Sequence, residues 1–313
     1  MKDLSVFLST ATLVILIGYI SYKGLHTPSR DTMSDEEVAL DKMETEGEQP
    51  DRLPAVSFDL PKEFFFAGEP VPMNEPDVRE RFDKELQINT YLHSNTLFLM
   101  KRANRWMPQI TAILKKYNVP EDFKYLPLIE SALINDISPK DAVGFWQILK
   151  TSGKELGLEI TSEVDERYNP LKATEAACKY IMKAHAKFGN WTVVAASYNR
   201  GMGGMERALD NQQVKSYYDL YLNDETSRYV FRILAIKEIV EHPAKYGFKL
   251  KPEHLYQPEK LRYVTVNETI KDLIPFAKAN GTNYKLLKRY NPWLQDDKLT
   301  VKKGKTYRIA LPQ

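Results

Sequence analysis

Residues 126–153 read LPLIESALINDISPKDAVGFWQILKTSG and carry one carboxylate, Glu130, inside an apolar stretch. The pattern predicts a helix in which four apolar residues lie close to Glu130: Leu126, Ile129, Leu133 and Ile134. If this face points inward, loss of solvation raises the pKa of the Glu130 carboxyl and keeps it protonated at neutral pH. A protonated carboxyl in an apolar cleft is suited to protonate the leaving oxygen of a glycosidic bond. A solvent-exposed helical glutamate is the alternative.

Enzymes that hydrolyse glycosidic bonds usually hold a second carboxyl group about 5–10 Å from the first. The nearest aspartates downstream of Glu130 are Asp136 and Asp141, in the segment NDISPKDA. Its polar residues and its proline predict a loop, so we expect both aspartates to be surface turn residues. The alternative is that one of them positions a water molecule for hydrolysis.

The composition excludes several classes of site. The 313 residues carry a formal net charge of +2, so no basic face for nucleic acid is expected. The only cysteine, Cys178, is expected to be a core thiol, and the five histidines form no zinc-binding pair, so we expect no metal and no cofactor. Ser131 lacks His and Asp partners for acyl transfer. The GMGG sequence at 201–204 lacks the Lys of a phosphate loop and predicts a tight turn.

The N-terminus predicts a membrane anchor. Residues 1–24 are apolar from about Leu4 to Ile20, at the short end of the roughly 17–25 residues that span a bilayer. We expect an uncleaved signal-anchor and export of the rest of the chain, with a cleaved signal peptide as the alternative.

Residues 25–77 predict a connection rather than a folded domain. Their first part, residues 27–51, is acidic and free of aromatic residues, which is typical of a flexible tether. The second part is rich in proline and contains Phe64, Phe65 and Phe66. We expect it to lie extended on the domain surface without regular structure.

Residues 78–250 are predicted to be essentially all α-helical. Apolar residues recur at spacings of three and four from 78 to 119, with breaks suggested by Asn89 and Asn95. Further helices are predicted at 172–188, 191–201 and 225–242, the first stopped by Gly189 and the last by Pro243.

Residues 258–313 predict a small βααβ module. LRYVTV at 261–266 alternates like a strand, two short helical patterns follow, and KKGKTYRIALP at 302–312 gives a turn and a closing strand. Between residues 285 and 305 the module contains seven basic residues: Lys285, Lys288, Arg289, Lys298, Lys302, Lys303 and Lys305. A solvated charged face explains them, and attraction to an anionic wall is the alternative.

Four motifs in the helical region occur in a fixed order: YLPLIESAL (125–133), AVGFWQIL (142–149), AASYNRGMGG (195–204) and ETSRYV (225–230). Together they resemble the lytic transglycosylases of the soluble-lytic-transglycosylase-like family, over roughly residues 79–248. The resemblance implies a mainly α fold, with a goose-type lysozyme-like catalytic domain followed by the small module. Trp146 stands where the family usually has methionine, which resembles a membrane-bound branch of the family.

The resemblance implies which residues form the site. Glu130 is the catalytic residue. The substrate-binding residues are Ser131, Gly144, Phe145, Trp146, Gln147, Tyr198, Asn199, Gly201 and Tyr229.

Each residue type suits such a site physically. Gly144 has no Cβ and lets the backbone approach a bulky ligand. Phe145 and Trp146 supply apolar walls around the glutamate or stack on a sugar. The amides of Gln147 and Asn199 can orient hydroxyl and N-acetyl groups.

For three aromatic residues of the motifs, the role is less specific. The phenol of Tyr229 can steer Glu130 or bind substrate. Packing in an ordinary aromatic core is the alternative for Phe145, Tyr198 and Tyr229.

The family's reaction, as the resemblance implies it, needs one carboxyl group. The glutamate protonates the oxygen between N-acetylmuramic acid and N-acetylglucosamine, then accepts the proton of the muramoyl 6-hydroxyl as a 1,6-anhydro ring closes. The substrate supplies the nucleophile, so no second carboxylate is required. A goose-type hydrolase and a non-catalytic peptidoglycan-binding scaffold are the alternatives.

The C-terminal residues resemble a LysM domain, which in this family binds glycans that contain N-acetylglucosamine. A structural cap on the catalytic domain is the alternative for this module. We therefore expect peptidoglycan strands as the partner, membrane contact through the N-terminal segment, and a monomer. The expected location is the periplasmic side of a bacterial cell envelope.

Overall fold

The computed structural model describes residues 56–313, so the predictions for residues 1–24 and for most of the tether lie outside the described residues. The helices before the C-terminal module are α3 Pro76–Tyr91, α4 His93–Lys116, α5 Leu126–Ser131, α6 Lys150–Glu155, α7 Pro170–Phe188, α8 Trp191–Arg200, α9 Met202–Gln212 and α10 Asp224–Glu241. This confirms the mainly α fold class. From residue 56 onwards, no helix has both the length and the apolar composition that a membrane span requires.

The predicted helices form where capping residues support them. α3 and α4 meet at Leu92, between the predicted breaks at Asn89 and Asn95. α7 starts at Pro170 because the Asn169 side chain accepts hydrogen bonds from two backbone amides of its first turn. It ends at Gly189, where φ is +67°.

The prediction that the phenylalanine stretch has no regular structure is wrong. Residues Phe64–Phe66 (β1) and Glu69–Val71 (β2) form an antiparallel hairpin. Phe64 and Phe66 are buried in the main core while Phe65 is exposed, the alternation of a strand with one face inward. The core surface that makes this hairpin stable comes from distant segments, for example Phe82 and Phe123, whose rings lie 5.1 and 5.3 Å from those of Phe64 and Phe66.

The hairpin also fixes the start of α8. Both oxygens of the Glu69 carboxylate accept hydrogen bonds there, from the backbone N of Trp191 (2.6 Å) and of Thr192 (3.0 Å). Negative charge at a helix N-terminus is favourable because the backbone amides there have no helical partner. The N-terminal hairpin therefore holds the helix that carries Tyr198 and Asn199.

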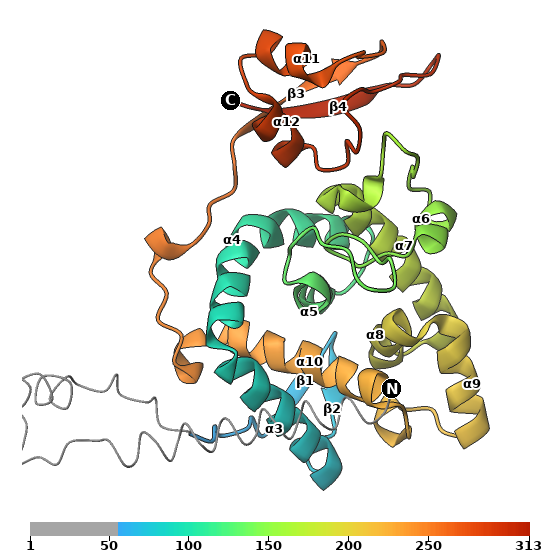
Figure 1. Cartoon of the computed structure of the whole chain (residues 1–313). Coiled ribbons are helices and arrows are strands. Elements are labelled where there is room, and N and C mark those ends of the chain that lie inside the picture. Colours follow the sequence, from blue (N-terminus) through green and yellow to red (C-terminus); the bar gives the residue numbers. More distant parts are fainter. Residues whose placement is uncertain (1–55) are drawn as a thin grey trace, which may run out of the picture. The chain divides into compact units, whose positions relative to one another are not determined.

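The short helix α5 lies at the centre of the helical region (Figure 1). It is surrounded by α4, α7, α8 and α10, and packs directly on α10. Pro127 restarts the chain as a helix after the 3₁₀ turn Glu121–Tyr125. The segment that contains Glu130 is thus enclosed by helices from both earlier and later parts of the sequence.

The predicted tight turn at GMGG is present only at its first residue, because the rest of the segment is helical. Only Gly201 is left-handed, with φ of +78°, and Gly203 and Gly204 lie in the first turn of α9. One such glycine suffices to redirect the chain between α8 and α9.

The C-terminal module has the predicted βααβ order. Strands β3 Leu261–Val266 and β4 Tyr307–Pro312 pair antiparallel, with helices α11 Leu273–Ala279 and α12 Tyr284–Tyr290 between them. Pro275 does not interrupt α11, because it lies in the first turn, where its missing N–H has no helical partner. The module has its own apolar core, which includes Val164 from the helical region.

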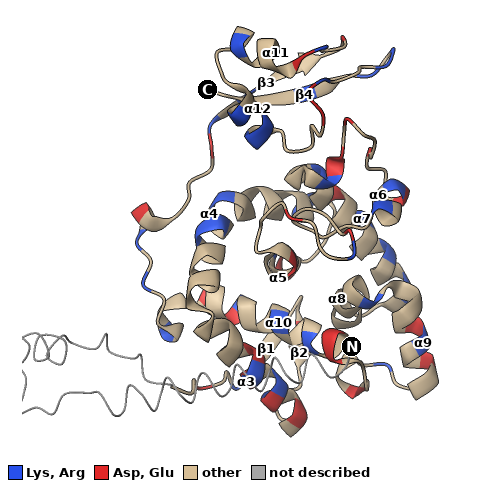
Figure 2. Cartoon of the chain, in the orientation of Figure 1, with Lys and Arg blue, Asp and Glu red and all other residues tan. Residues whose placement is uncertain are grey.

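Lys and Arg residues are prominent along the ribbon of this module (Figure 2). Two of the seven basic residues form ion pairs with the helical region: Lys298 with Glu163 (3.8 Å) and Lys305 with Glu159 (2.5 Å). Arg289 pairs with Glu259, and Lys288 donates to backbone carbonyls of the module. Three of the seven charges, those of Arg289, Lys298 and Lys305, are thus paired with carboxylates, whereas Lys285, Lys302 and Lys303 are exposed.

Candidate active site

Glu130 lies in the last turn of α5 and bonds to α10. Its Oε1 accepts a hydrogen bond from the phenol of Tyr229 over 2.5 Å. Glu130 is half-buried, and Tyr229 is 2% exposed. The predicted pairing of these residues is therefore present, although they are far apart in the sequence.

The surroundings of Glu130 favour its protonated form. Burial raises the pKa of its carboxyl to about 7, because a charge is poorly solvated there. The hydrogen bond from Tyr229 and the positive charge of Arg232 lower this pKa, and the negative charge of Glu225 raises it. Burial also raises the pKa of the phenols of Tyr198 and Tyr229, so both remain hydrogen-bond donors.

Arg232 and Glu225 belong to the surroundings of Glu130 but were not predicted. Arg232 donates from Nη2 to the carbonyl oxygen of Ile129 over 2.7 Å and thereby braces α5. Residues 225, 229 and 232 follow one another at helical spacings of four and three, so they share a face of α10. This periodicity is visible in the sequence and would have identified both residues once Tyr229 was chosen.

Residues 132–148, the active-site loop, connect α5 to the Gly-Phe-Trp-Gln motif. Four of its non-glycine residues have left-handed backbone: Ala132, Leu133, Asp141 and Gln147, with φ of +50°, +58°, +58° and +46°. Such conformations are costly for residues with a Cβ and often occur at functional sites.

Two hydroxyls beside Glu130 hold this loop. Ser131 Oγ donates to the carbonyl oxygen of Phe145 over 2.9 Å, and Tyr198 donates to that of Trp146 over 2.8 Å. The loop is therefore fixed directly to α5 and α8, the helices of the first and third motifs.

Gly144 is required for a different reason from the predicted one. A Cβ at this position would lie well inside van der Waals contact of the carbonyl oxygen of Arg167. The close approach is thus to the protein's own backbone, at a φ of +80°.

The two aromatic residues of the motif are buried. Trp146 is 0% exposed and donates from its indole N–H to Thr174 Oγ1 over 2.8 Å, so it offers no face for a sugar to stack on. Phe145 is 3% exposed and contacts the ring of Trp106 edge-on. The side chains of both residues pack in the main core, which was the alternative for Phe145.

The side-chain amides of the motifs bond within the protein. Gln147 Nε2 donates to the carbonyl oxygens of Gly144 (2.9 Å) and Asp136 (3.2 Å). Asn199 donates to Glu225 Oε1 over 3.0 Å and accepts from the Thr226 hydroxyl over 2.9 Å. In this structure both amides brace the site rather than point free toward a ligand.

Asp136 and Asp141 are exposed loop residues, as predicted. The carboxylate of Asp136 accepts a hydrogen bond from the next backbone amide over 2.8 Å. The negative charge of Glu225, which is exposed, raises the pKa of Glu130.

A cavity of about 260 Å³ adjoins Glu130. It is lined by residues of the α3–α4 junction, of α5 and of α10, including Leu92, Thr96, Ser131, Arg232 and Ile236. Larger hollows of about 420 and 390 Å³ lie elsewhere in the described part of the chain, and none of the predicted site residues lines either. We therefore take the cavity at Glu130 as the candidate substrate site, because predicted site residues line it.

Two family models match this chain. Residues 108–220 match the Transglycosylase SLT domain, and residues 262–313 match the Soluble lytic transglycosylase C-terminal LysM-like domain.

Several known proteins are similar to it. "Membrane-bound lytic murein transglycosylase D" of Escherichia coli (strain K12) is 32% identical over 257 residues, 79% of this chain and 54% of that protein. The chain thus spans about half the length of this relative. A "Putative tributyltin chloride resistance protein" of Alteromonas sp. (strain M-1) is 30% identical over 128 residues, 40% of this chain and 62% of that protein. A solved structure of an inactive mutant of lytic transglycosylase Slt from Pseudomonas aeruginosa covers 60% of this chain and 37% of its own, with 16% identity and a TM-score of 0.36.

Proposed function

We propose that this chain, which contains a transglycosylase SLT domain and a C-terminal LysM-like domain, is a peptidoglycan lytic transglycosylase. In this proposal it cleaves the β-1,4 bond between N-acetylmuramic acid and N-acetylglucosamine without water and leaves 1,6-anhydro ends. The observation that carries the proposal is one half-buried carboxyl, Glu130, with a pKa of about 7 beside a cavity.

The proposed reaction uses Glu130 twice. Its carboxylic acid protonates the glycosidic oxygen, and the bond from that oxygen to C1 of the muramoyl sugar breaks. The muramoyl 6-hydroxyl then bonds to C1, and its proton returns to the Glu130 carboxylate, so the enzyme is regenerated. A pKa near the working pH suits a group that serves as acid and then as base.

Mass spectrometry of the soluble products from purified peptidoglycan sacculi tests this function. The proposed reaction gives muropeptides with 1,6-anhydro ends. Reducing ends would instead indicate a goose-type hydrolase, with Glu225 the first carboxylate to consider for placing water. Tight binding to sacculi without soluble products would indicate a non-catalytic scaffold.

The pH dependence of the initial rate is predicted by the state of Glu130. Because the protonated acid is required and its pKa is about 7, the rate should fall above neutral pH with an apparent pKa near 7. The bond from Tyr229 lowers this pKa, so in Tyr229→Phe the fall should move to higher pH. We expect a move of roughly one unit, since a hydrogen bond to a charged group contributes about 1.5–3 kcal/mol and one unit equals about 1.4 kcal/mol.

Tyr246→Phe is the matched control for this measurement. The Tyr246 phenol donates to Glu238 over 2.7 Å, so this variant also removes a buried Tyr–Glu hydrogen bond, but away from Glu130. Its pH profile should equal that of the wild type. A Tyr229→Phe profile that stays in place, or moves to lower pH, would contradict the proposed role of Tyr229.

We also propose how the chain is arranged in the cell. The apolar run within residues 1–24 supports anchoring on the periplasmic side of a bacterial envelope, and the E. coli relative is named as membrane-bound. Residues 25–77 would connect the anchor to a catalytic domain at 78–250 and a glycan-binding module at 258–313. We propose that the chain acts as a monomer, and sedimentation of the purified chain tests this.

A further inference from the structure

Residues 159–165 of the helical region, which we call the docking segment, contact the C-terminal module. The backbone N of Asp165 donates to the carbonyl oxygen of Trp293 over 2.9 Å, and that of Gln295 donates to Glu163 over 2.8 Å. Between these bonds the side chain of Val164, 2% exposed, lies in the core of the module. The docking segment thus forms an antiparallel β-bridge with the module, between Val164 and Leu294.

Carboxylates of the docking segment reinforce this pairing. The Glu163 carboxylate accepts hydrogen bonds from the Thr300 backbone N (2.6 Å) and hydroxyl (3.0 Å). The Glu159 carboxylate accepts from the Tyr307 phenol over 3.0 Å and pairs with Lys305. The contact therefore combines apolar burial, backbone bonds and ion pairs.

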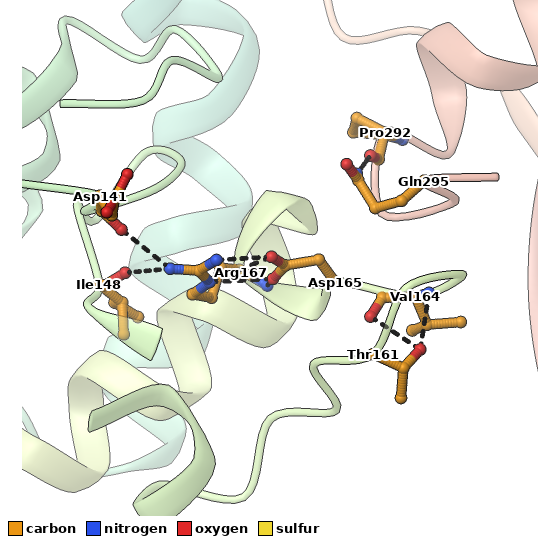
Figure 3. A network of polar contacts seen from close by, with 8 residues as sticks. All are labelled: Asp141, Ile148, Thr161, Val164, Asp165, Arg167, Pro292 and Gln295. Atoms are coloured by element: carbon orange, nitrogen blue, oxygen red, sulfur yellow. Dashed lines mark hydrogen bonds and ion pairs between the residues drawn. The ribbon is translucent and has the colours of Figure 1, made fainter. Parts of the chain in front are cut away.

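Arg167 connects the docking segment to the active-site loop (Figure 3). Its Nε and Nη2 donate to the two oxygens of the Asp165 carboxylate, at 3.0 and 2.7 Å. Its Nη1 donates to the carbonyl oxygens of Asp141 (3.1 Å) and Ile148 (3.2 Å). Arg167 and Asp165 are 7% and 6% exposed, so these bonds are shielded from water.

Arg167 holds the active-site loop on both sides of the Gly-Phe-Trp-Gln motif. Asp141 and Ile148 flank this motif, and Val143 and Ile148 exchange two backbone hydrogen bonds of 3.1 Å. Within the motif, the carbonyl oxygens of Phe145 and Trp146 are bonded to hydroxyls beside Glu130, as described above. Hydrogen bonds therefore connect Arg167, through the motif, to the surroundings of the candidate acid.

We propose that Arg167 is a positioning residue that couples docking of the C-terminal module to the geometry of the active-site loop. The inference rests on the proposed function in that Glu130 is taken as the acid. Trp293 fixes Asp165, Asp165 fixes Arg167, and Arg167 fixes the loop on both sides of the Gly-Phe-Trp-Gln motif. No part of this relay contacts the reacting atoms.

Only arginine satisfies this set of acceptors. The planar guanidinium has five N–H donors and can bond a carboxylate with two of them while others reach carbonyl oxygens on its far edge. A lysine at 167 keeps the charge beside Asp165 but has one compact ammonium group, which cannot span the carboxylate and both carbonyls. Arg167→Lys thus releases the loop without leaving Asp165 unpaired.

The test is a titration of Glu130 in the full chain without substrate, by carboxyl ¹³C NMR, with its signal assigned from Glu130→Gln. The ionisable groups that face Glu130, namely Tyr198 on α8 and Glu225, Tyr229 and Arg232 on α10, are unchanged in Arg167→Lys. A released loop admits water, so we expect the midpoint to fall by about half a pH unit or more toward the ordinary glutamate value. The initial rate on sacculi should fall roughly 10- to 100-fold.

Arg228→Lys is the matched control. Arg228 also bonds a buried carboxylate with two nitrogens, Nε to Glu85 over 2.5 Å and Nη2 over 3.4 Å, without contact to the active-site loop. It should lose thermal stability like Arg167→Lys but leave the Glu130 titration unchanged. An Arg167→Lys titration equal to that of the wild type overturns the positioning role.

The link to the module is tested by Glu163→Ala, alone and combined with Arg167→Lys. Glu163→Ala alone should shift the Glu130 titration in the same direction, and should add little once Arg167→Lys has broken the relay. Full additivity, or no shift in Glu163→Ala alone, overturns the coupling. These titrations need no substrate, whereas absent anhydro products from the wild type would refute the proposed function itself.

Discussion

Glu130→Gln should lose glycan cleavage, with a fall in rate of roughly 10²- to 10⁴-fold, the range that a general acid–base group contributes. Glutamine has the shape of a protonated glutamic acid but cannot transfer a proton to the glycosidic oxygen. Release of soluble muropeptides from sacculi, followed by chromatography, measures the loss. Binding to sacculi should persist, because the C-terminal module is unaltered.

The same variant should be more stable than the wild type at alkaline pH. The pKa of Glu130 in the folded chain, about 7, lies above the ordinary value of 4.5, so the folded state binds the proton more tightly than the unfolded state does. Wild-type stability therefore declines as pH rises from 4.5 to 7 and then stays lower, while glutamine does not titrate. The difference in Tm between variant and wild type should grow over this window and level off above it.

Asp136→Asn and Asp141→Asn are the matched controls for Glu130→Gln. Each replaces an exposed carboxylate of the active-site loop by an amide. Both variants should keep most of the wild-type rate. Near-normal cleavage by Glu130→Gln, or a loss in either aspartate variant as large as that expected for Glu130→Gln, would contradict the assignment of the acid.

The sequence was sufficient to predict the elements whose determinants are local. The apolar spacing and caps of α7, with Asn169 and Gly189 at its ends, specify a helix without reference to other segments. The pairing of Glu130 with Tyr229 was predicted through a resemblance in motif order, since no local pattern relates residues on α5 and α10.

Features that depend on long-range packing escaped prediction. The β1–β2 hairpin is stable because Phe64 and Phe66 fit a core formed by distant residues, and a short proline-containing stretch does not reveal this. Trp146 was expected to contact the ligand, but its indole donates to Thr174 in the core. The sequence alone does not distinguish an aromatic residue that packs in the core from one that contacts a ligand. Arg167 was not singled out in the sequence, because only the folded chain places it between the docking segment and the active-site loop.

Gly144→Ala should produce the second large loss, in both stability and rate. At φ of +80° an alanine costs about 1–2 kcal/mol, and pressing its Cβ onto the carbonyl oxygen of Arg167 costs about 1–3 kcal/mol more. We therefore expect the free energy of unfolding to fall by about 2–5 kcal/mol. Because the active-site loop must move away from Arg167, kcat/KM should fall roughly 10²-fold at temperatures at which the variant is folded.

Gly247→Ala separates the two causes of this loss. Gly247 also has φ of +80°, but a Cβ there would meet no atom within 4 Å. It should show only the backbone cost of about 1–2 kcal/mol, with an unchanged rate, as measured by urea denaturation and product release. Equal losses in the two variants would mean that Gly144 is needed for its backbone conformation alone. A greater loss in Gly144→Ala, accompanied by a lower Glu130 midpoint, would show that contact with Arg167 sets the position of the loop around the acid.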